Sequence, residues 1–84
     1  MSFNLVYTHR AEKDIGRLDA LAKKRIAKVL VRYKDDPLKY AEKIADPSLG
    51  SYRFKIGDYR IIFDIEKNNI VILRVGHRRD IYRK

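Results

Sequence analysis

Apolar and polar positions alternate at the start of the chain and then recur at helical spacing. Residues 3–8 alternate and predict a strand. Apolar side chains recur about every 3.6 positions over residues 9–18 and again over residues 20–34, which predicts two helices with one apolar face each. Thr8 and Asp19 stand immediately before these segments, and their side-chain oxygens suit the N-cap position.

The period changes to two in the second half, which is typical of strands. A proline opens a short third helix predicted over residues 37–45, and three alternating segments follow at residues 51–56, 59–66 and 70–75. This order predicts one α+β domain over residues 1–84, with a four-stranded antiparallel sheet and two to three N-terminal helices packed on one face.

A Gly-Asp pair at residues 57–58 separates two of these segments and predicts a two-residue hairpin turn of type I′ or II′. The turn sets Lys55 directly opposite Arg60 on the ribbon. Like charges at such a position cost up to about 1 kcal/mol of stability. A function for the two cations would explain why the domain keeps them there.

The next turn, at residues 67–69, contains two asparagines and predicts a three-residue loop with an asparagine in the left-handed conformation. That loop pairs Ile62 with Arg74 and Arg60 with Gly76. One face of the sheet then carries a cluster of cations with few acidic residues to neutralise it, namely Arg53, Lys55, Arg60 and Arg74. Such a cluster is suited to bind phosphate.

Composition favours a basic, cytoplasmic domain that binds a polyanion. The 84 residues are 45% hydrophobic, too apolar for a disordered chain, and contain no cysteine for disulfides or thiolate metal ligands. The longest apolar run is Ile70–Leu73, and the N-terminus lacks the basic and apolar regions of a signal peptide, so we expect neither a membrane segment nor secretion. A net charge of +9 and a pI near 10.0 favour nucleic acid as the partner.

The C-terminal segment adds groups suited to RNA chemistry. His77 titrates in a range that suits proton transfer, although it is also an ordinary loop residue. Tyr82 is suited to stack on an RNA base, and anchoring in the core is its alternative role. Arg78 and Arg79 extend the cation cluster, although most surface cations are simply solvated.

Two segments, YRFKIGDYRIIFDI at residues 52–65 and VGHRRDIYRK at residues 75–84, resemble the RelE branch of the RelE/ParE toxin superfamily. The resemblance spans essentially the whole chain, because two basic amphipathic helices precede these motifs. It implies the toxin of a type II toxin–antitoxin pair, a metal-independent endoribonuclease that cleaves mRNA in the ribosomal A site. It also implies a RelB-like antitoxin as partner and a toxin–antitoxin hetero-oligomer.

The resemblance places the family's catalytic lysine at Lys55. The companion cations and the late aromatic residue of the family fall, in chain order, on Arg53, Arg60, Arg78 and Tyr82. This chain departs from some members in two respects. The spacing between Arg78 and Tyr82 is shorter, and His77 stands where those members have another cation.

The implied reaction is attack of the RNA 2′-OH on the adjacent phosphate, which needs a proton acceptor, a proton donor and positive charge around the phosphorane. We expect Lys55 to take the 2′-OH proton, with the neighbouring cations disfavouring its charged form. Arg53 and Arg60 would clamp the phosphate, and Arg78 or His77 would serve the leaving oxygen. The remaining cations would bind RNA, mainly the ribosomal backbone and with salt-sensitive affinity, namely Lys23, Lys24, Lys28, Lys34, Arg74 and Arg79.

Two other functions fit parts of the pattern. A ParE-like toxin that poisons DNA gyrase would share the fold but generally lack the assembled basic set. A basic module that binds nucleic acid or an antitoxin without turnover would share the composition. We expect no cofactor for any of the three, because two histidines and no cysteine are a poor basis for a metal site.

Overall fold

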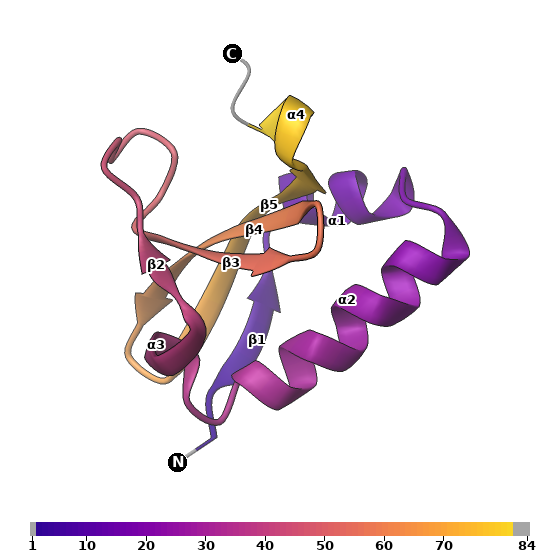
Figure 1. The fold of residues 1–84 in the computed structure, drawn as a ribbon. Helices are drawn as coiled ribbons and strands as arrows, with labels where there is room; N and C mark the ends of the chain where they lie inside the picture. Colours follow the sequence, from indigo (N-terminus) through magenta and orange to yellow (C-terminus); the bar gives the residue numbers. More distant parts are fainter. Residues whose placement is uncertain (1, 82–84) are drawn as a thin grey trace.

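A computed structural model describes residues 2–81 of the chain, and Figure 1 shows their arrangement. The elements in chain order are β1 (Asn4–Tyr7), α1 (His9–Gly16), α2 (Ala20–Tyr33), α3 (Pro37–Tyr40), β2 (Glu42–Lys43), β3 (Tyr52–Ile56), β4 (Tyr59–Glu66), β5 (Asn69–His77) and α4 (Arg78–Ile81). The strands form one five-stranded sheet in the order β1-β5-β4-β3-β2, and α1 and α2 pack on one of its faces. The predicted α+β class is confirmed.

Both long helices begin where the capping residues predict. The Thr8 side chain accepts a hydrogen bond from the backbone N–H of Ala11 at 3.1 Å, and the Asp19 side chain accepts one from Ala22 at 2.8 Å. Each bond satisfies a backbone donor that has no partner within its own helix. In α2 the apolar stripe turns Ile26 and Leu30 into the core.

The predicted four-stranded antiparallel sheet is wrong in two respects. Strand β1 pairs with β5 in parallel, with Leu5 opposite Ile70, so the sheet is mixed. Periodicity identifies a strand but not its direction, which here is set by the path of the helices that follow β1. The third helix ends at Tyr40 rather than continuing to Ala45, and Glu42–Lys43 forms a fifth strand on β3. Two residues are too few to show a period in the sequence.

The first hairpin has the predicted register. Lys55 lies opposite Arg60 and Ile56 opposite Tyr59 across the Gly57-Asp58 turn. Gly57 has a positive φ of 58°, whereas the φ of Asp58 is not positive. A positive φ at the first central position alone identifies the turn as type II′.

The second hairpin reaches the predicted register by a different route. Its turn has two residues rather than three, because Glu66 pairs with Asn69, and Lys67 rather than an asparagine takes the left-handed conformation, with a φ of 55°. Phe63 pairs with Ile72 and Ile62 with Arg74, so Leu73 is an extra residue that forms a β-bulge. The bulge shifts the pairing by one residue, and the predicted Ile62–Arg74 and Arg60–Gly76 pairs are confirmed.

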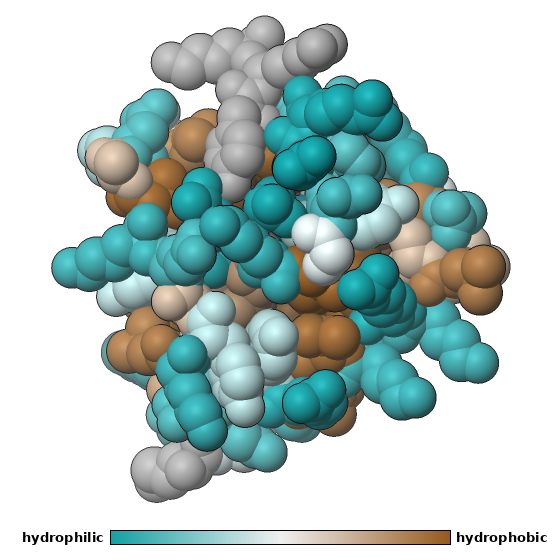
Figure 2. Space-filling model, viewed as in Figure 1, coloured by the Kyte–Doolittle hydropathy of each residue, from teal (hydrophilic) through white to brown (hydrophobic). Residues whose placement is uncertain are grey.

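The core lies between the sheet and α2. Phe54 and Phe63 are fully buried and their rings stack with centroids 4.3 Å apart, while Ile26 and Leu30 of α2 cover them. Hydrophilic side chains cover most of the face shown in Figure 2, with apolar surface exposed between them. Within residues 2–81, no helix is long and apolar enough to cross a membrane.

We expect Gly57→Ala to destabilise the fold by about 1–2 kcal/mol, because an L-residue is strained at this positive φ. A Cβ there would also lie 2.9 Å from the guanidinium of Arg25, which would have to move. Gly16→Ala is the matched control, since its Cβ would meet nothing within 4 Å. Urea unfolding measures both, and an equal effect of the two changes would contradict the turn assignment.

Candidate functional site

Cations line an open groove of about 420 Å³ at the hairpin end of the sheet. Among the described residues the groove is lined by Arg53, Lys55, Arg60, Arg78 and Arg79. The structure thus brings together four of the predicted catalytic residues and one predicted RNA-binding arginine. A concave surface with this charge attracts an anion with several oxygens.

Strand alternation places three of these cations on the same face. Phe54 and Ile61 are fully buried on the helix-covered side of the sheet. Successive side chains of a strand point to opposite faces, so Arg53 and Lys55 of β3 and Arg60 of β4 project from the side away from the helices. The Lys55–Arg60 pair predicted from the turn is therefore part of the groove.

The hairpin turn holds two of the arginines at the end of the groove. The backbone N–H of Arg78 donates to the carbonyl of Asp58 at 2.7 Å, and its Nε lies 3.7 Å from the Asp58 carboxylate. Nη1 of Arg60 donates to the carbonyls of Gly57 and Tyr59 at 2.9 and 3.0 Å. The two bonds from Nη1 restrict the Arg60 side chain before any ligand arrives, which lowers the entropy cost of binding, and the backbone bond fixes the position of Arg78.

Glu42 belongs to this site and was missed in the sequence. Its Oε1 lies 3.0 Å from Nη2 and 3.1 Å from Nε of Arg53, and 3.2 Å from Nζ of Lys55. Two hydrogen bonds lower the pKa of Glu42 below its ordinary value. The bond from Lys55 has the larger effect and the bond from Arg53 the smaller. The residue was missed because it was assigned to the third helix, whereas β2 carries it to the edge of β3.

The Glu42 carboxylate changes the electrostatics expected for Lys55. The carboxylate lies 3.2 Å from Nζ of Lys55, so this side chain has an acidic neighbour as well as the arginines that the sequence predicted beside it. It also offsets the repulsion between Lys55 and Arg60. The cations of the groove are thus arranged to bind an oxyanion.

His77 lies on the other face of the sheet. It pairs with Tyr59, their rings meet edge to face with centroids 5.9 Å apart, and it does not line the groove. Its Nδ1 accepts a hydrogen bond from the backbone N–H of Arg79 at 3.1 Å, and its Nε2 is 4.0 Å from the Asp58 carboxylate. Its contacts tie the start of α4 to the hairpin.

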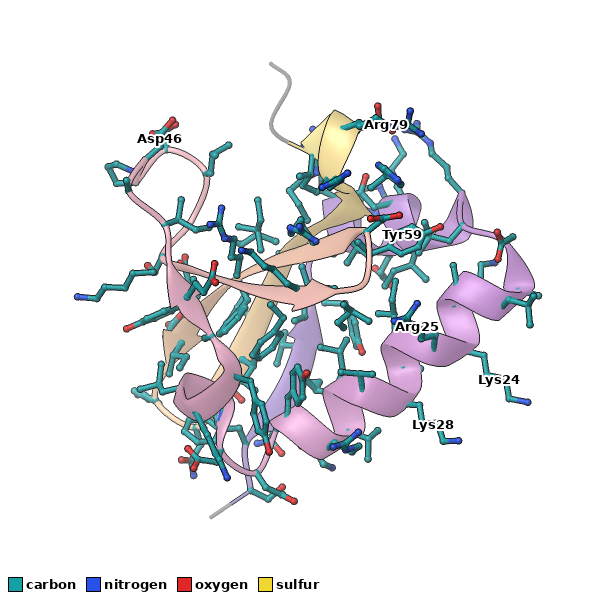
Figure 3. The ribbon with its side chains drawn as sticks, in the orientation of Figure 1. Lys24, Arg25, Lys28, Asp46, Tyr59 and Arg79 are labelled. Carbon is teal, nitrogen blue, oxygen red and sulfur yellow. The ribbon has the colours of Figure 1, made fainter. Side chains whose placement is uncertain are left out.

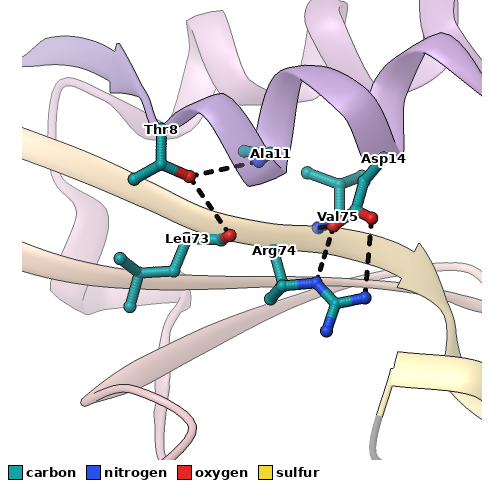
Figure 4. Close-up of polar contacts among 6 residues, drawn as sticks. All are labelled: Thr8, Ala11, Asp14, Leu73, Arg74 and Val75. Atoms are coloured by element: carbon teal, nitrogen blue, oxygen red, sulfur yellow. Dashed lines mark hydrogen bonds and ion pairs between the residues drawn. The ribbon is translucent and has the colours of Figure 1, made fainter.

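Arg74 is held by an ion pair instead of lining the groove. Its Nε lies 2.8 Å from Oδ2 of Asp14, and the same oxygen accepts the backbone N–H of Val75 at 3.0 Å (Figure 4). The Asp14 side chain is only 5% exposed. Thr8 Oγ1 donates to the carbonyl of Leu73 at 3.3 Å, so both ends of α1 are bonded to the bulge.

The predicted RNA-binding lysines lie on α2 and its C-terminal cap, away from the groove. Figure 3 shows Lys24 and Lys28 extending away from α2, while Arg25 lies between α2 and the first hairpin. Tyr82 lies outside the described residues. Within residues 2–81, no three His, Cys, Asp or Glu side chains are grouped so that they could hold a metal ion.

The fold and the groove define a small basic α+β domain with a cluster of cations on one sheet face. A family model described as the ParE toxin of the type II toxin–antitoxin system parDE matches residues 5–82. Toxin RelG of Mycobacterium tuberculosis is 30% identical over 91 residues, and the match covers all of both chains. The chain belongs to the RelE/ParE family of type II toxins, as its motifs predicted.

Solved structures share the fold. The toxin–antitoxin complex RelBE2 of Mycobacterium tuberculosis contains a chain that matches with a TM-score of 0.83 at 22% identity, covering 93% of this chain and 100% of that one. The RelB–RelE complex of Methanococcus jannaschii matches with a TM-score of 0.71 at 26% identity, covering 92% and 94%. The RelE-like fold is therefore shared with proteins of low sequence identity.

We expect Asp14→Ala to lower the free energy of unfolding by about 2–4 kcal/mol, because it leaves the Arg74 guanidinium and the Val75 N–H without their shared acceptor. Asp35→Ala removes an exposed carboxylate and should change the free energy of unfolding by less than about 0.5 kcal/mol. Chemical denaturation compares the two variants. Equal stabilities would show that the carboxylate does not hold α1 to β5.

Proposed function

We propose that this toxin is an endoribonuclease that cleaves mRNA in the ribosomal A site, by attack of the 2′-OH on the adjacent phosphate and without a metal. The observation that carries the proposal is the groove in which Lys55 lies among four arginines. Phosphoryl transfer of this kind needs positive charge around the phosphorane and groups that move two protons. A cation cluster alone would serve binding, but an amine within it adds a group able to exchange a proton.

Each cation has a distinct place in this mechanism. Arg53 and Arg60, on adjacent strands of one face, would hold the scissile phosphate. Lys55 would accept the 2′-OH proton, acting from its neutral form after its own proton has passed to solvent. Arg78 would stabilise the charge on the leaving oxygen. The position of His77 on the opposite face supports Arg78 over His77 in that role.

The partners we propose are a RelB-like antitoxin, the ribosome and mRNA. The matched structures of RelBE2 and of the Methanococcus jannaschii complex each pair a toxin with an antitoxin. Leu21 and Val31 of α2 are 82% and 55% exposed, and apolar surface of this kind commonly receives an amphipathic helix of a partner. The lysines of α2 would bind ribosomal RNA backbone without regard to sequence.

A ParE-like gyrase poison is the second candidate function, because the matching family model is described as a ParE toxin. A gyrase poison needs no phosphodiester chemistry of its own. The assembled groove of Lys55, Arg60 and Arg78 therefore supports the nuclease.

The test is cleavage of a defined mRNA on purified 70S ribosomes, mapped by primer extension. We expect cuts at A-site codons from the wild-type protein, and a loss of about a hundredfold or more in rate for Lys55→Ala and Arg78→Ala. Lys13→Ala, an exposed cation of α1, is the matched control and should cleave normally. EDTA saturated with Mg²⁺ removes transition metals while leaving the ribosomes intact, and it should not change the rate.

Each contrary result has a definite meaning. No cuts from a folded, toxic wild-type protein would reject the nuclease, and accumulation of gyrase–DNA cleavage complexes would then establish the second function. No cuts and no toxicity would leave a module that binds nucleic acid or an antitoxin without turnover.

A further inference from the structure

Two of the cations that line the groove already pair with an oxyanion, which the chain itself supplies. Oε1 of Glu42 is within 3.2 Å of both Arg53 and Lys55, so this carboxylate occupies the place between the two cations where an oxygen of a bound phosphate would make the same contacts. The carboxylate is charged at neutral pH, because the pKa of Glu42 lies below an ordinary value that is itself acidic. An incoming phosphate must therefore displace it.

We propose that Glu42 is an internal competitor for the RNA phosphate and determines which polyanions the groove accepts. The inference rests on the proposed function, because it assigns the groove to a phosphodiester. It assigns to a carboxylate the role of limiting which polyanions bind at a site otherwise made of cations.

The contacts of Arg60 and Arg78 explain which phosphates can displace Glu42 with a net gain. A phosphate that reaches only Arg53 and Lys55 replaces one charge-assisted pair with another and gains little. Arg60 is bonded to backbone carbonyls and Arg78 lies near Asp58, so both make their described contacts away from Glu42. Only a phosphate that engages these arginines at the same time obtains interactions that the carboxylate does not already provide.

The position of Glu42 permits the displacement. Its side chain is 48% exposed, and β2 is a two-residue strand at the edge of the sheet, paired only with β3. An exposed carboxylate can turn into solvent without leaving a buried charge behind. The groove can therefore exchange its own anion for a ligand without a change in the sheet.

The consequence concerns nonspecific binding of nucleic acid. A chain with a net charge of +9 attracts any nucleic acid, and this attraction carries no sequence or site information. Glu42 offsets one of the two positive charges of Arg53 and Lys55, so a phosphate that must displace it binds appreciably only if it makes further contacts in the groove.

The experiment measures binding of a fluorescein-labelled single-stranded oligonucleotide in which 2′-deoxy sugars prevent cleavage. We expect Glu42→Gln to bind about three- to tenfold more tightly than wild type, as measured by anisotropy at fixed salt. Glu66→Gln is the matched control, because it removes the same charge at the exposed far end of β4 and should change the affinity less than about twofold. Circular dichroism checks that both variants are folded.

Glu42→Asp keeps the charge on a shorter arm and should fall between wild type and Glu42→Gln. Equal affinities for wild type and Glu42→Gln, equal gains for Glu42→Gln and Glu66→Gln, or weaker binding by Glu42→Gln would each overturn the inference. Because the probe cannot be cleaved, tighter binding by Glu42→Gln supports it even if the ribosome assay rejects the nuclease. Wild-type and Glu42→Gln proteins that both fail to bind would overturn the inference and the phosphate site together.

Discussion

The carboxylate of Asp14 is the contact on which the geometry of the sheet depends. It lies almost fully buried at the end of α1 and accepts from both Arg74 and the backbone of Val75. A buried carboxylate is tolerated only where charged and polar donors replace its water. It therefore holds α1 against β5 at one position, directly after the bulge at Leu73.

The bulge in turn determines what reaches the groove. Without the extra residue at Leu73, the two-residue turn before β5 would leave Arg60 one position out of register with the end of that strand, and every later side chain would point to the opposite face. With it, Gly76 lies beside Arg60 and α4 starts at the hairpin, where Arg78 bonds to Asp58. A structural acid thus positions groove cations that it does not touch.

The sequence predicted what short-range rules control. Thr8 and Asp19 predict where the helices begin, because capping is a local interaction. The Gly57-Asp58 turn likewise determines the pairing register of the two strands that it joins. The bulge, the parallel direction of β1 and the strand at Glu42–Lys43 depend on contacts between distant segments and leave no period in the sequence. For the same reason, most of the groove cations were predicted from β3 and β4, whereas the acid that pairs with two of them was not.

The position of β5 in the sheet has a consequence for folding during synthesis. This strand lies between β1 and β4, yet it is formed by Asn69–His77, close to the end of the chain. The first strand therefore has no partner while the rest of the domain is being synthesised, and the pairing of Leu5 with Ile70 closes one of the longest loops available. The groove is completed later still, by Arg78 and Arg79. A nascent chain of this toxin carries α1, α2 and its first hairpin before it has an assembled site.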